Sequence, residues 1–325
     1  MDFELSDEQT MLREVSRSML AAHCTLDRVR AVSSDADDID DGLWRRGVEM
    51  GWTGLPVPDR HGGSGMGLVE STLVAEEIGR ALAPTLWNDT AIAAWAAAAG
   101  GAPDEVIAAL AEGDQKAALV IDTGFVHAAP AVDWLLAVDD SVRLIRAGSA
   151  HTLRRTTLDE SRRFYSVSAL GETAHQLDVE PQRVRDAAAV LIAADSLGVG
   201  EVTMRMTADY VKVRKQFDRP IGSFQVVKHK IADMLIALDG VRAATHYAAM
   251  AFDAGLPDAS SAASVAKAFA AEKVSAITSD ALQTHGGIGF TWEHDLHLYL
   301  RRATTDEFLG GSAAFHHDRV ATLMA

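Results

Sequence analysis

Residues Arg214 to Gln225 form a first segment of this sequence that could bind an anion. They read Arg-Lys-Gln-Phe-Asp-Arg-Pro-Ile-Gly-Ser-Phe-Gln, which predicts a turn at Pro220 and Gly222 and an N-cap at Ser223 for the next helix. Backbone N–H groups at a helix N-terminus and the guanidinium fork of an arginine both suit phosphate oxygens. Taken alone, the segment is more simply explained as a corner between two helices whose charges face water.

A second candidate is the glycine cluster from Gln283 to Gly289, which reads Gln-Thr-His-Gly-Gly-Ile-Gly. Gly286, Gly287 and Gly289 follow a helical pattern, and glycine permits positive φ and close approach of a ligand to the backbone. A helix C-cap with no ligand is the simpler explanation for such a cluster on its own.

The histidines do not form a pattern typical of a metal site. His285, His294 and His297, with His316 and His317, lack a clear carboxylate ligand beside them. His294 and His297 lie about one turn apart and more simply line a helix surface. We therefore predict no metal, and no Gly-x-Ser-x-Gly nucleophile elbow is present either.

Helical patterns precede and follow a short region of a different kind. We expect helices from about Val184 to Arg214, Ser223 to Ala254 and Ala259 to His285, then a helical stretch to Met324. Near the N-terminus we expect a capping box at Ser6 and Gln9 and a helix from Leu68 to Leu82. Between these regions, three apolar runs predict strands: Ala117–Ile121, Trp134–Val138 and Val142–Ile145.

The sequence thus predicts a mainly α fold with a small β domain. We expect an N-terminal helical domain at 1–116, a reduced middle β domain at 117–182 and a C-terminal four-helix bundle at 183–325.

Composition narrows the classes of partner. A formal net charge of −16 argues against sequence-independent binding to nucleic acid. Cys24 is the only cysteine, so no intrachain disulfide or cysteine metal cluster is possible. The acidic start Met1–Glu8 lacks the basic region of a signal peptide, and the apolar stretch Ala91–Ala99 is too short to span a membrane. We expect a cytoplasmic protein without a membrane span.

Taken together, the segment from Arg214 and the glycine cluster from Gln283 resemble motifs of the acyl-CoA dehydrogenase family of flavoproteins. The shared patterns are Arg-x-x-Phe-x-x-Pro-Ile-x-x-Phe-Gln from Arg214 and Gln-x-x-Gly-Gly-x-Gly-Phe from Gln283. Gly51–Pro56, His61–Gly65 and Glu76–Arg80 also resemble the family's helical N-terminal domain, so the resemblance covers nearly the whole chain.

The resemblance implies FAD as cofactor, an acyl-CoA thioester as substrate and an electron-transfer acceptor. In the implied α,β-dehydrogenation, a carboxylate removes the α-proton while the β-hydrogen leaves as hydride to the flavin. It also implies that the residues of the two motifs contact FAD: Arg214, Gln216, Phe217, Phe224, Gln225, Gln283, Gly286, Gly287 and Gly289.

The chain departs from the family at the catalytic base. Counting from Arg301–Ala303, the position of the family's glutamate falls on Gly310, which has no titratable group. The alternative position, on the first helix of the C-terminal bundle, falls near Ala188. Asp186 and Glu307 are weak substitutes, because Asp186 lies roughly 200° around the helix from Ala188 and Glu307 is expected to point elsewhere. We predict no catalytic residue in this chain.

Further departures lie in the middle domain and in the first motif. The family's Thr-Glu-Pro-x-x-Gly-Ser-Asp and Trp-x-Thr or Trp-x-Ser patterns, which hold the flavin ring and substrate, do not occur. The chain passes from Ile121–Gly124 almost directly to Val132–Leu135. Asp218 stands where the family usually has glycine, and its charge opposes a diphosphate unless Arg214 or Arg219 neutralises it.

In the family's homodimers, one subunit holds the flavin ring and carries the base, while its neighbour contacts the ADP part through the two motifs. This chain keeps only the second set. We hypothesise that it shares FAD with a related full-length subunit, as in the truncated subunits of α2β2 acyl-CoA dehydrogenases that oxidise steroid side chains. The alternatives are an active homo-oligomer with a non-standard base and a non-enzymatic scaffold.

Overall fold

The computed structural model describes residues 4–34, 38–121 and 124–325. Its N-terminal part is helical, with α1 (Asp7–His23), α2 (Leu26–Ser34), α3 (Asp41–Glu49), α4 (Leu68–Ala81), α5 (Trp87–Ala99) and α6 (Asp104–Ala111). The capping box is confirmed, because Ser6 Oγ accepts from the Gln9 backbone N–H and the Gln9 side chain accepts from the Ser6 N–H. The predicted helix from Leu68 is confirmed as α4.

The middle part consists of two small sheets. One has the order β1-β3-β4-β7 and the other the order β2-β6-β5. β1 and β3 run parallel, and the other neighbouring pairs in both sheets are antiparallel. The strands are β1 (Ala117–Ile121), β2 (Phe125–His127), β3 (Trp134–Val138), β4 (Val142–Arg146), β5 (His151–Arg155), β6 (Phe164–Ala169) and β7 (Thr173–Leu177). The predicted runs at β1, β3 and β4 are confirmed. Of the predicted deletion, the part at Asp122 and Thr123 lies outside the described residues.

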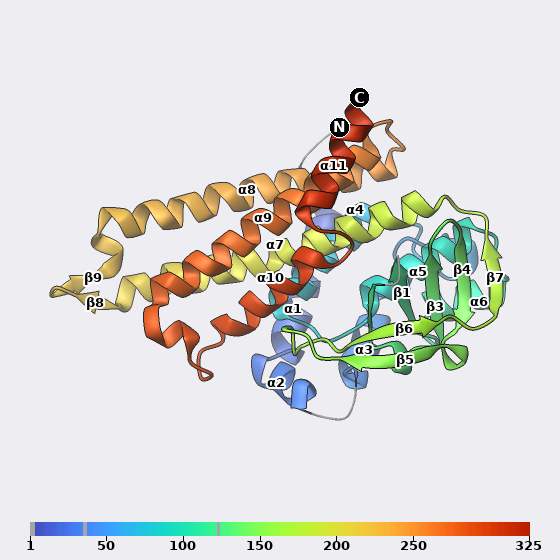
Figure 1. Cartoon of the computed structure of the whole chain (residues 1–325), viewed down its shortest axis with the longest axis horizontal. Coiled ribbons are helices and arrows are strands. Elements are labelled where there is room, and N and C mark those ends of the chain that lie inside the picture. Colours follow the sequence, from blue (N-terminus) through green and yellow to red (C-terminus); the bar gives the residue numbers. More distant parts are fainter. Residues whose placement is uncertain (1–3, 35–37, 122–123) are drawn as a thin grey trace.

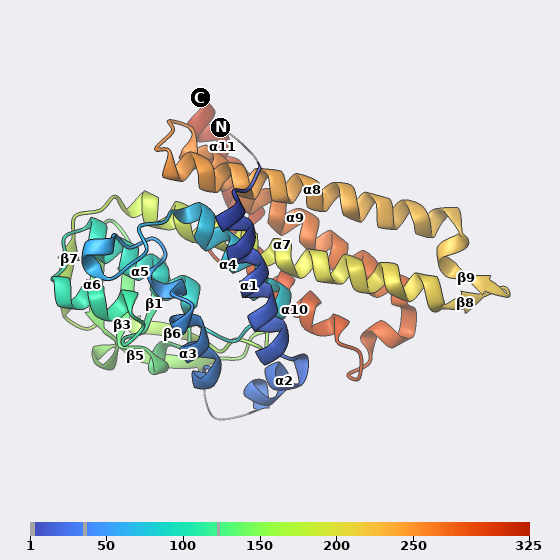
Figure 2. The same ribbon diagram turned by 180° about the vertical axis from the view of Figure 1, so that it is seen from behind.

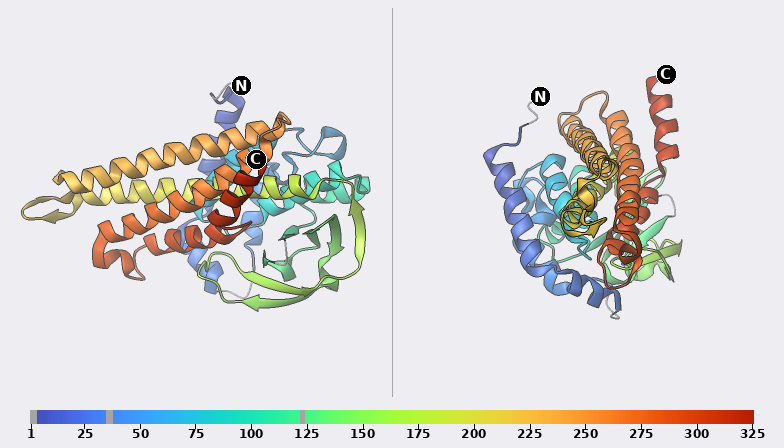
Figure 3. Two further views of the ribbon diagram at one scale, coloured as in Figure 1. Left: turned by 45° about the horizontal axis from the view of Figure 1, so that its top comes forward. Right: turned by 90° about the vertical axis from the view of Figure 1, so that its left-hand side faces the viewer.

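The C-terminal part is a bundle of long helices (Figures 1 and 2). It contains α7 (Pro181–Val213), α8 (Gln225–Asp253), α9 (Ala259–His285), α10 (Leu296–Phe308) and α11 (Ala313–Met324). A hairpin of β8 (Lys215–Gln216) and β9 (Arg219–Pro220) joins α7 to α8, at the end of the bundle that points away from the β domain (Figure 3). The fold class predicted from the sequence is therefore confirmed.

One local prediction in the bundle is wrong. Ser223 does not cap α8: a short 3₁₀ turn at Ile221–Ser223 shifts the N-cap to Phe224, which supplies no side-chain cap. The helical stretch to Met324 follows the 3₁₀ turn Gly286–Phe290 and is divided into α10 and α11 by the turn at Gly310 and Gly311.

The long helix α7 crosses α4 at backbone contact. A Cβ at Gly79 would lie 2.0 Å from the Asp195 carbonyl oxygen, and one at Gly198 would lie 1.9 Å from the Glu76 carbonyl oxygen. Within the described residues, α7 alone is long and apolar enough to span a membrane by composition, but 83% of its most apolar window is buried inside the protein. Its apolar surface is used for packing against the other helices.

Candidate functional site

The β8–β9 hairpin presents the first motif at the outer end of the bundle. Lys215 pairs with Pro220 and Gln216 with Arg219, which leaves Phe217 and Asp218 at the turn with φ of 53° and 62°. Aspartate tolerates this left-handed conformation, whereas a bulky aromatic residue rarely adopts it. The Phe217 side chain is nevertheless 85% exposed. The hairpin therefore holds an aromatic ring in solvent at some conformational cost.

The polar residues of this motif are available to a ligand. Arg214, Gln216 and Gln225 are exposed, and among the described residues their side chains have no hydrogen-bond or ion-pair partner. The neighbouring aromatic rings contact each other: Phe217 packs edge to face on Phe224, with ring centroids 6.1 Å apart. The Arg219 guanidinium lies 4.0 Å from the centroid of the Phe224 ring. The unpaired guanidinium of Arg214 suits a phosphate, and the two aromatic rings of the same motif suit a planar base.

The second motif ends α9 with an open backbone. Gly286 has a φ of 64°, and its N–H bonds to the carbonyls of Gln283 and Leu282. No atom lies within 4 Å of the place where a Cβ would stand on Gly286 or on Gly287. Gly289 is different, since a Cβ there would lie 3.1 Å from that of His285. The first two glycines leave room for a ligand, and the third allows the turn to pack.

The structure brings the two motifs to the same end of the bundle (Figure 1). Lys230 Nζ on α8 donates to Gln283 Oε1 at 2.9 Å. The hydroxyl of Tyr210 on α7 donates to the His285 carbonyl at 3.3 Å, and the rings of Tyr210 and His285 stack at 4.3 Å. Burial lowers the pKa of His285, so the imidazole is a neutral part of this packing.

Sequence reasoning missed three exposed apolar residues next to the glycine turn. Ile288, Phe290 and Trp292 are all exposed, and Trp292 stacks on His297 with ring centroids 4.6 Å apart. The repeated placement of large apolar side chains along one exposed turn could have identified them. Across the described ranges, no three His, Cys, Asp or Glu residues form a group that could hold a metal ion.

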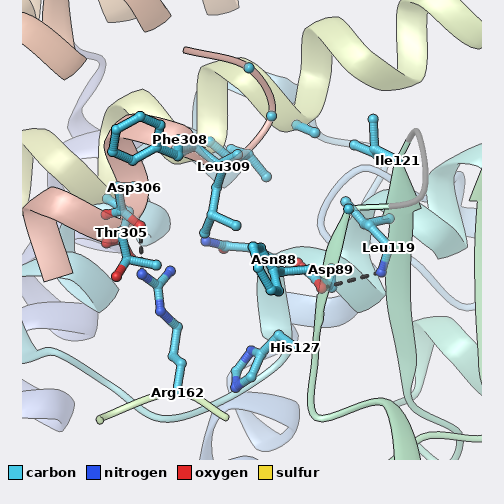
Figure 4. A pocket seen from close by; sticks show the side chains of 18 of the residues that line it. Asn88, Asp89, Leu119, Ile121, His127, Arg162, Thr305, Asp306, Phe308 and Leu309 are labelled. Carbon is cyan, nitrogen blue, oxygen red and sulfur yellow. Dashed lines mark hydrogen bonds and ion pairs between the residues drawn. The ribbon is translucent and has the colours of Figure 1, made fainter. Parts of the chain in front are cut away.

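A second region is a cavity of about 820 Å³ where the N-terminal helices, the β domain and the C-terminal bundle meet (Figure 4). Residues from α5, β1, β2, α7, α10 and the turn after α10 line it. Gly310 and Ala188, the two positions at which the family's catalytic base is expected, are both in the wall of this cavity.

Gly310 contributes only backbone to this wall. It has a φ of 67°, and a Cβ there would lie 3.0 Å from Ile192 Cδ1. The turn is held from behind, because Lys267 Nζ donates to the carbonyls of Glu307 and Gly311 at 3.1 and 3.0 Å. Burial lowers the pKa of Lys267 to about 8. The turn is thus fixed without a carboxylate at Gly310.

The two weak substitutes for the base are engaged elsewhere. Asp186 accepts hydrogen bonds from Gln182 and Ser260 and pairs with Arg319 Nη1 at 2.9 Å. Glu307 accepts from the Ser275 hydroxyl at 2.8 Å. Neither carboxylate lines the cavity.

Sequence reasoning also missed a buried ionic network beside the cavity, which joins α7 and α10 to the segment between β5 and β6. Arg302 makes a bidentate pair with Asp195 at 2.9 and 2.7 Å. Arg162 donates to Asp159 and to Asp306, both at 2.6 Å. Burial raises the pKa of Asp306 to about 7, against the opposing effect of Arg162. The Arg302–Asp195 and Arg162–Asp306 pairs join residues more than 100 positions apart, so no local sequence pattern predicts them.

The opposite wall carries polar side chains of a different kind. Burial raises the pKa of Asp89 to about 6, and its carboxylate accepts only from the Leu119 N–H, at 3.3 Å, among the described residues. Burial, with the nearby positive charges of Arg162 and Arg302, lowers the pKa of His127 to about 3. The buried Nε2 atom of this neutral imidazole has no hydrogen-bond partner within the described chain.

Comparison with known proteins identifies the family. The pattern described as "Acyl-CoA dehydrogenase, N-terminal domain" matches residues 6–114, and "Acyl-CoA dehydrogenase, C-terminal domain" matches residues 185–324. Acyl-CoA dehydrogenase IpdE2 of Mycolicibacterium smegmatis is 36% identical over 92% of this chain and 93% of that protein. The chain belongs to the acyl-CoA dehydrogenase family, which is a family of oxidoreductases.

Solved structures with two-subunit names share the fold. A variant of the Tcur3481-Tcur3483 steroid ACAD has a TM-score of 0.89 and 26% identity, covering 98% of both chains. The ChsE4-ChsE5 complex from Mycobacterium tuberculosis has a TM-score of 0.88 and 25% identity, covering 100% of this chain and 99% of the other.

Proposed function

We propose that this chain is a supporting subunit that completes the FAD site of a related, catalytic acyl-CoA dehydrogenase subunit. One observation carries the proposal: the two motifs lie at the same end of the bundle with most of their residues exposed, while the expected position of the base is Gly310. The exposed ones are Arg214, Gln216, Phe217, Gln225, Gln283 and Gly287. The hetero-oligomer, not the isolated chain, then dehydrogenates an acyl-CoA thioester. FAD supplies the hydride acceptor when bound, and the partner supplies the base.

The residues at the outer end of the bundle fit the ADP part of FAD. Arg214 has a free guanidinium for phosphate, and Gly286 and Gly287 leave their backbone open to a close ligand. Gln216, Gln225 and the Phe217–Phe224 pair supply hydrogen bonds and aromatic contact. The cavity side offers no carboxylate at Gly310 or Ala188, so this chain would not catalyse the reaction alone.

Two comparisons support a heteromer and a bulky substrate. The similar structures named above are described by pairs of subunits, and one pair is described as a steroid ACAD. We extend to this chain both the pairing with a longer relative and the steroid-type acyl group. Electrons would leave the reduced flavin for an electron-transfer acceptor.

The test is co-expression with a related longer acyl-CoA dehydrogenase subunit, followed by purification and measurement of FAD per complex. Arg214→Ala removes the free guanidinium, and Gly287→Val places a side chain in the open space without an internal clash. Both changes should lower FAD occupancy and leave complex assembly intact. Arg45→Ala, at an exposed arginine, and Gly148→Val, at another glycine with open space, are matched controls that should leave occupancy unchanged.

Three outcomes would contradict the proposal. A yellow, active homo-oligomer purified from this chain alone would support the alternative of a non-standard base. Absence of both a complex and bound flavin after co-expression would support the scaffold alternative. Full FAD occupancy in both Arg214→Ala and Gly287→Val complexes would remove the cross-subunit role of this surface.

A further inference from the structure

The cavity has one polar wall whose hydrogen-bonding groups are not used by the protein. Asn88 and Asp89 on α5 and His127 on β2 line it (Figure 4). Within the described residues, the Asn88 side chain has no hydrogen-bond partner, and Asp89 accepts only from the Leu119 N–H. His127 is more than nine-tenths buried, and its Nε2 has no partner in the described chain. A buried polar atom normally has a partner, and the buried Nε2 atom of His127 has none within the described chain. Asn88 and Asp89 are half-buried and add unused hydrogen-bonding groups to the same wall.

The charged groups on the other walls already interact with other residues of the chain. Arg162 and Arg302 are tied to Asp159, Asp306 and Asp195 in the buried network. Arg319 pairs with Asp186. Arg185 donates to the carbonyls of Val138 and Asp139. The arginines that line the cavity therefore have their charges or donors engaged, while Asp89 disfavours a second negative charge beside it.

The rest of the lining is apolar and extends to an open rim. Ile92, Leu119, Ile121, Leu191 and Ile192 line the interior. At its surface, three lining phenylalanines are exposed: Phe125 by 56%, Phe308 by 65% and Phe315 by 53%. Large apolar side chains that face solvent around a cavity are typical of a binding site for an apolar molecule.

We infer that this cavity binds an uncharged, bulky alcohol, with its apolar body against the isoleucines and phenylalanines and its hydroxyl at Asn88, Asp89 and His127. A hydroxyl both donates and accepts, so it can donate to the Asp89 carboxylate and accept from the Asn88 amide or from the ring N–H of the neutral His127 imidazole. The volume lies within the range of about 300–1,000 Å³ for small-molecule sites. The inference is independent of the proposed FAD role, since none of these residues belongs to the two motifs.

The test is isothermal titration calorimetry of the full chain, alone and in its complex, at pH 7.5, where Asp89 is ionised. The probes are 1-adamantanol and 1-adamantanecarboxylate, which share a rigid apolar cage and differ in charge. The alcohol should bind at least about tenfold more tightly than the carboxylate, because a hydrogen bond is gained and a like-charge contact avoided. Equal or tighter binding of the carboxylate would overturn the inference.

Variants identify the wall that recognises the hydroxyl. Asp89→Asn keeps the side-chain volume and removes the charge. The ratio of the affinities for the alcohol and the carboxylate should therefore fall to several-fold at most, because the wall no longer repels a carboxylate. His127→Phe should weaken binding of the alcohol and leave the apolar contacts of its cage unchanged. Ala188→Trp should abolish binding of both probes, because the larger side chain fills the cavity. Asp140→Asn, at an exposed turn, is the matched control and should change nothing.

An unchanged preference in Asp89→Asn, or unchanged binding in a folded Ala188→Trp variant, would place the probe elsewhere and reject the site. FAD content of the complex should be the same in Asp89→Asn as in the unmodified protein. This readout separates a failure of the cavity inference from a failure of the FAD proposal.

Discussion

The outer end of the bundle and the cavity contain similar residue types, but use them differently. At the outer end, Arg214 has no partner among the described residues and lies in solvent. Beside the cavity, Arg302 is buried in a bidentate pair with Asp195. An arginine in a buried ion pair is part of the folded core, whereas an exposed arginine without a partner is available for a ligand. The buried ion pairs beside the cavity therefore hold the fold together, and the exposed residues at the outer end of the bundle are available to bind another molecule.

The largest effect should come from removing the buried arginine. Arg302→Met leaves the Asp195 carboxylate buried without its cation, which should lower the free energy of unfolding by about 3–5 kcal/mol. Arg214→Met should change it by less than about 0.5 kcal/mol, because its side chain is exposed. Urea denaturation of both variants measures the difference. Similar losses in the two variants would erase the distinction between the two regions.

Acid should act mainly on the cavity side. Burial lowers the pKa of His316 to about 4, so the folded state disfavours its protonation. Its contribution to stability is fully present above the unfolded pKa near 6.5 and is lost as the pH falls toward 4, by up to about 1.4 kcal/mol per pH unit. The His316→Gln variant should lose about 2 kcal/mol less than the unmodified protein between pH 6.5 and 4.5.

The measurement is a series of denaturation curves at each pH, read as the difference between the two proteins. Asp89 and Asp306 act in the opposite direction: their raised pKa values give stability that is lost as the pH rises toward 6 and 7. Because both carboxyl groups are present in both proteins, their effect cancels in the difference. Parallel pH profiles would contradict the assigned state of His316.

Restoring a carboxylate at Gly310 should not restore catalysis. Gly310→Glu forces a side chain onto a residue with a φ of 67° and against Ile192, which should cost about 1–2 kcal/mol of stability. Gly310→Ala should cost about 1 kcal/mol from the backbone alone. A dehydrogenase assay on the isolated Gly310→Glu chain should show no turnover, and measurable turnover would mean that the chain carries a complete site of its own.

The smallest effect should come from the strained turn of the hairpin. Phe217→Gly relieves the positive φ of an exposed aromatic residue and should raise stability by about 0.5 kcal/mol or leave it unchanged. The same change removes the ring that meets Phe224, so FAD occupancy of the complex should fall. A stability gain with undiminished flavin would show that Phe217 has no part in binding.

The sequence predicted the fold where a pattern was local. The helical periodicity that ends at His285 and the apolar runs at β1, β3 and β4 are each contained in one segment, and the structure has them at those positions. The strand His151–Arg155 was missed because its side chains are mainly polar and exposed. The N-cap at Ser223 failed because a 3₁₀ turn continues through it. Asp89 and His127 were missed because only the tertiary fold brings α5 and β2 to the same cavity.

The glycine contact between α4 and α7 has a mechanical consequence. With no side chain at Gly79 or Gly198, two helices touch backbone to backbone and cannot slide without steric collision. We expect the N-terminal domain and the bundle to move as one rigid body, so that two walls of the cavity keep a constant separation.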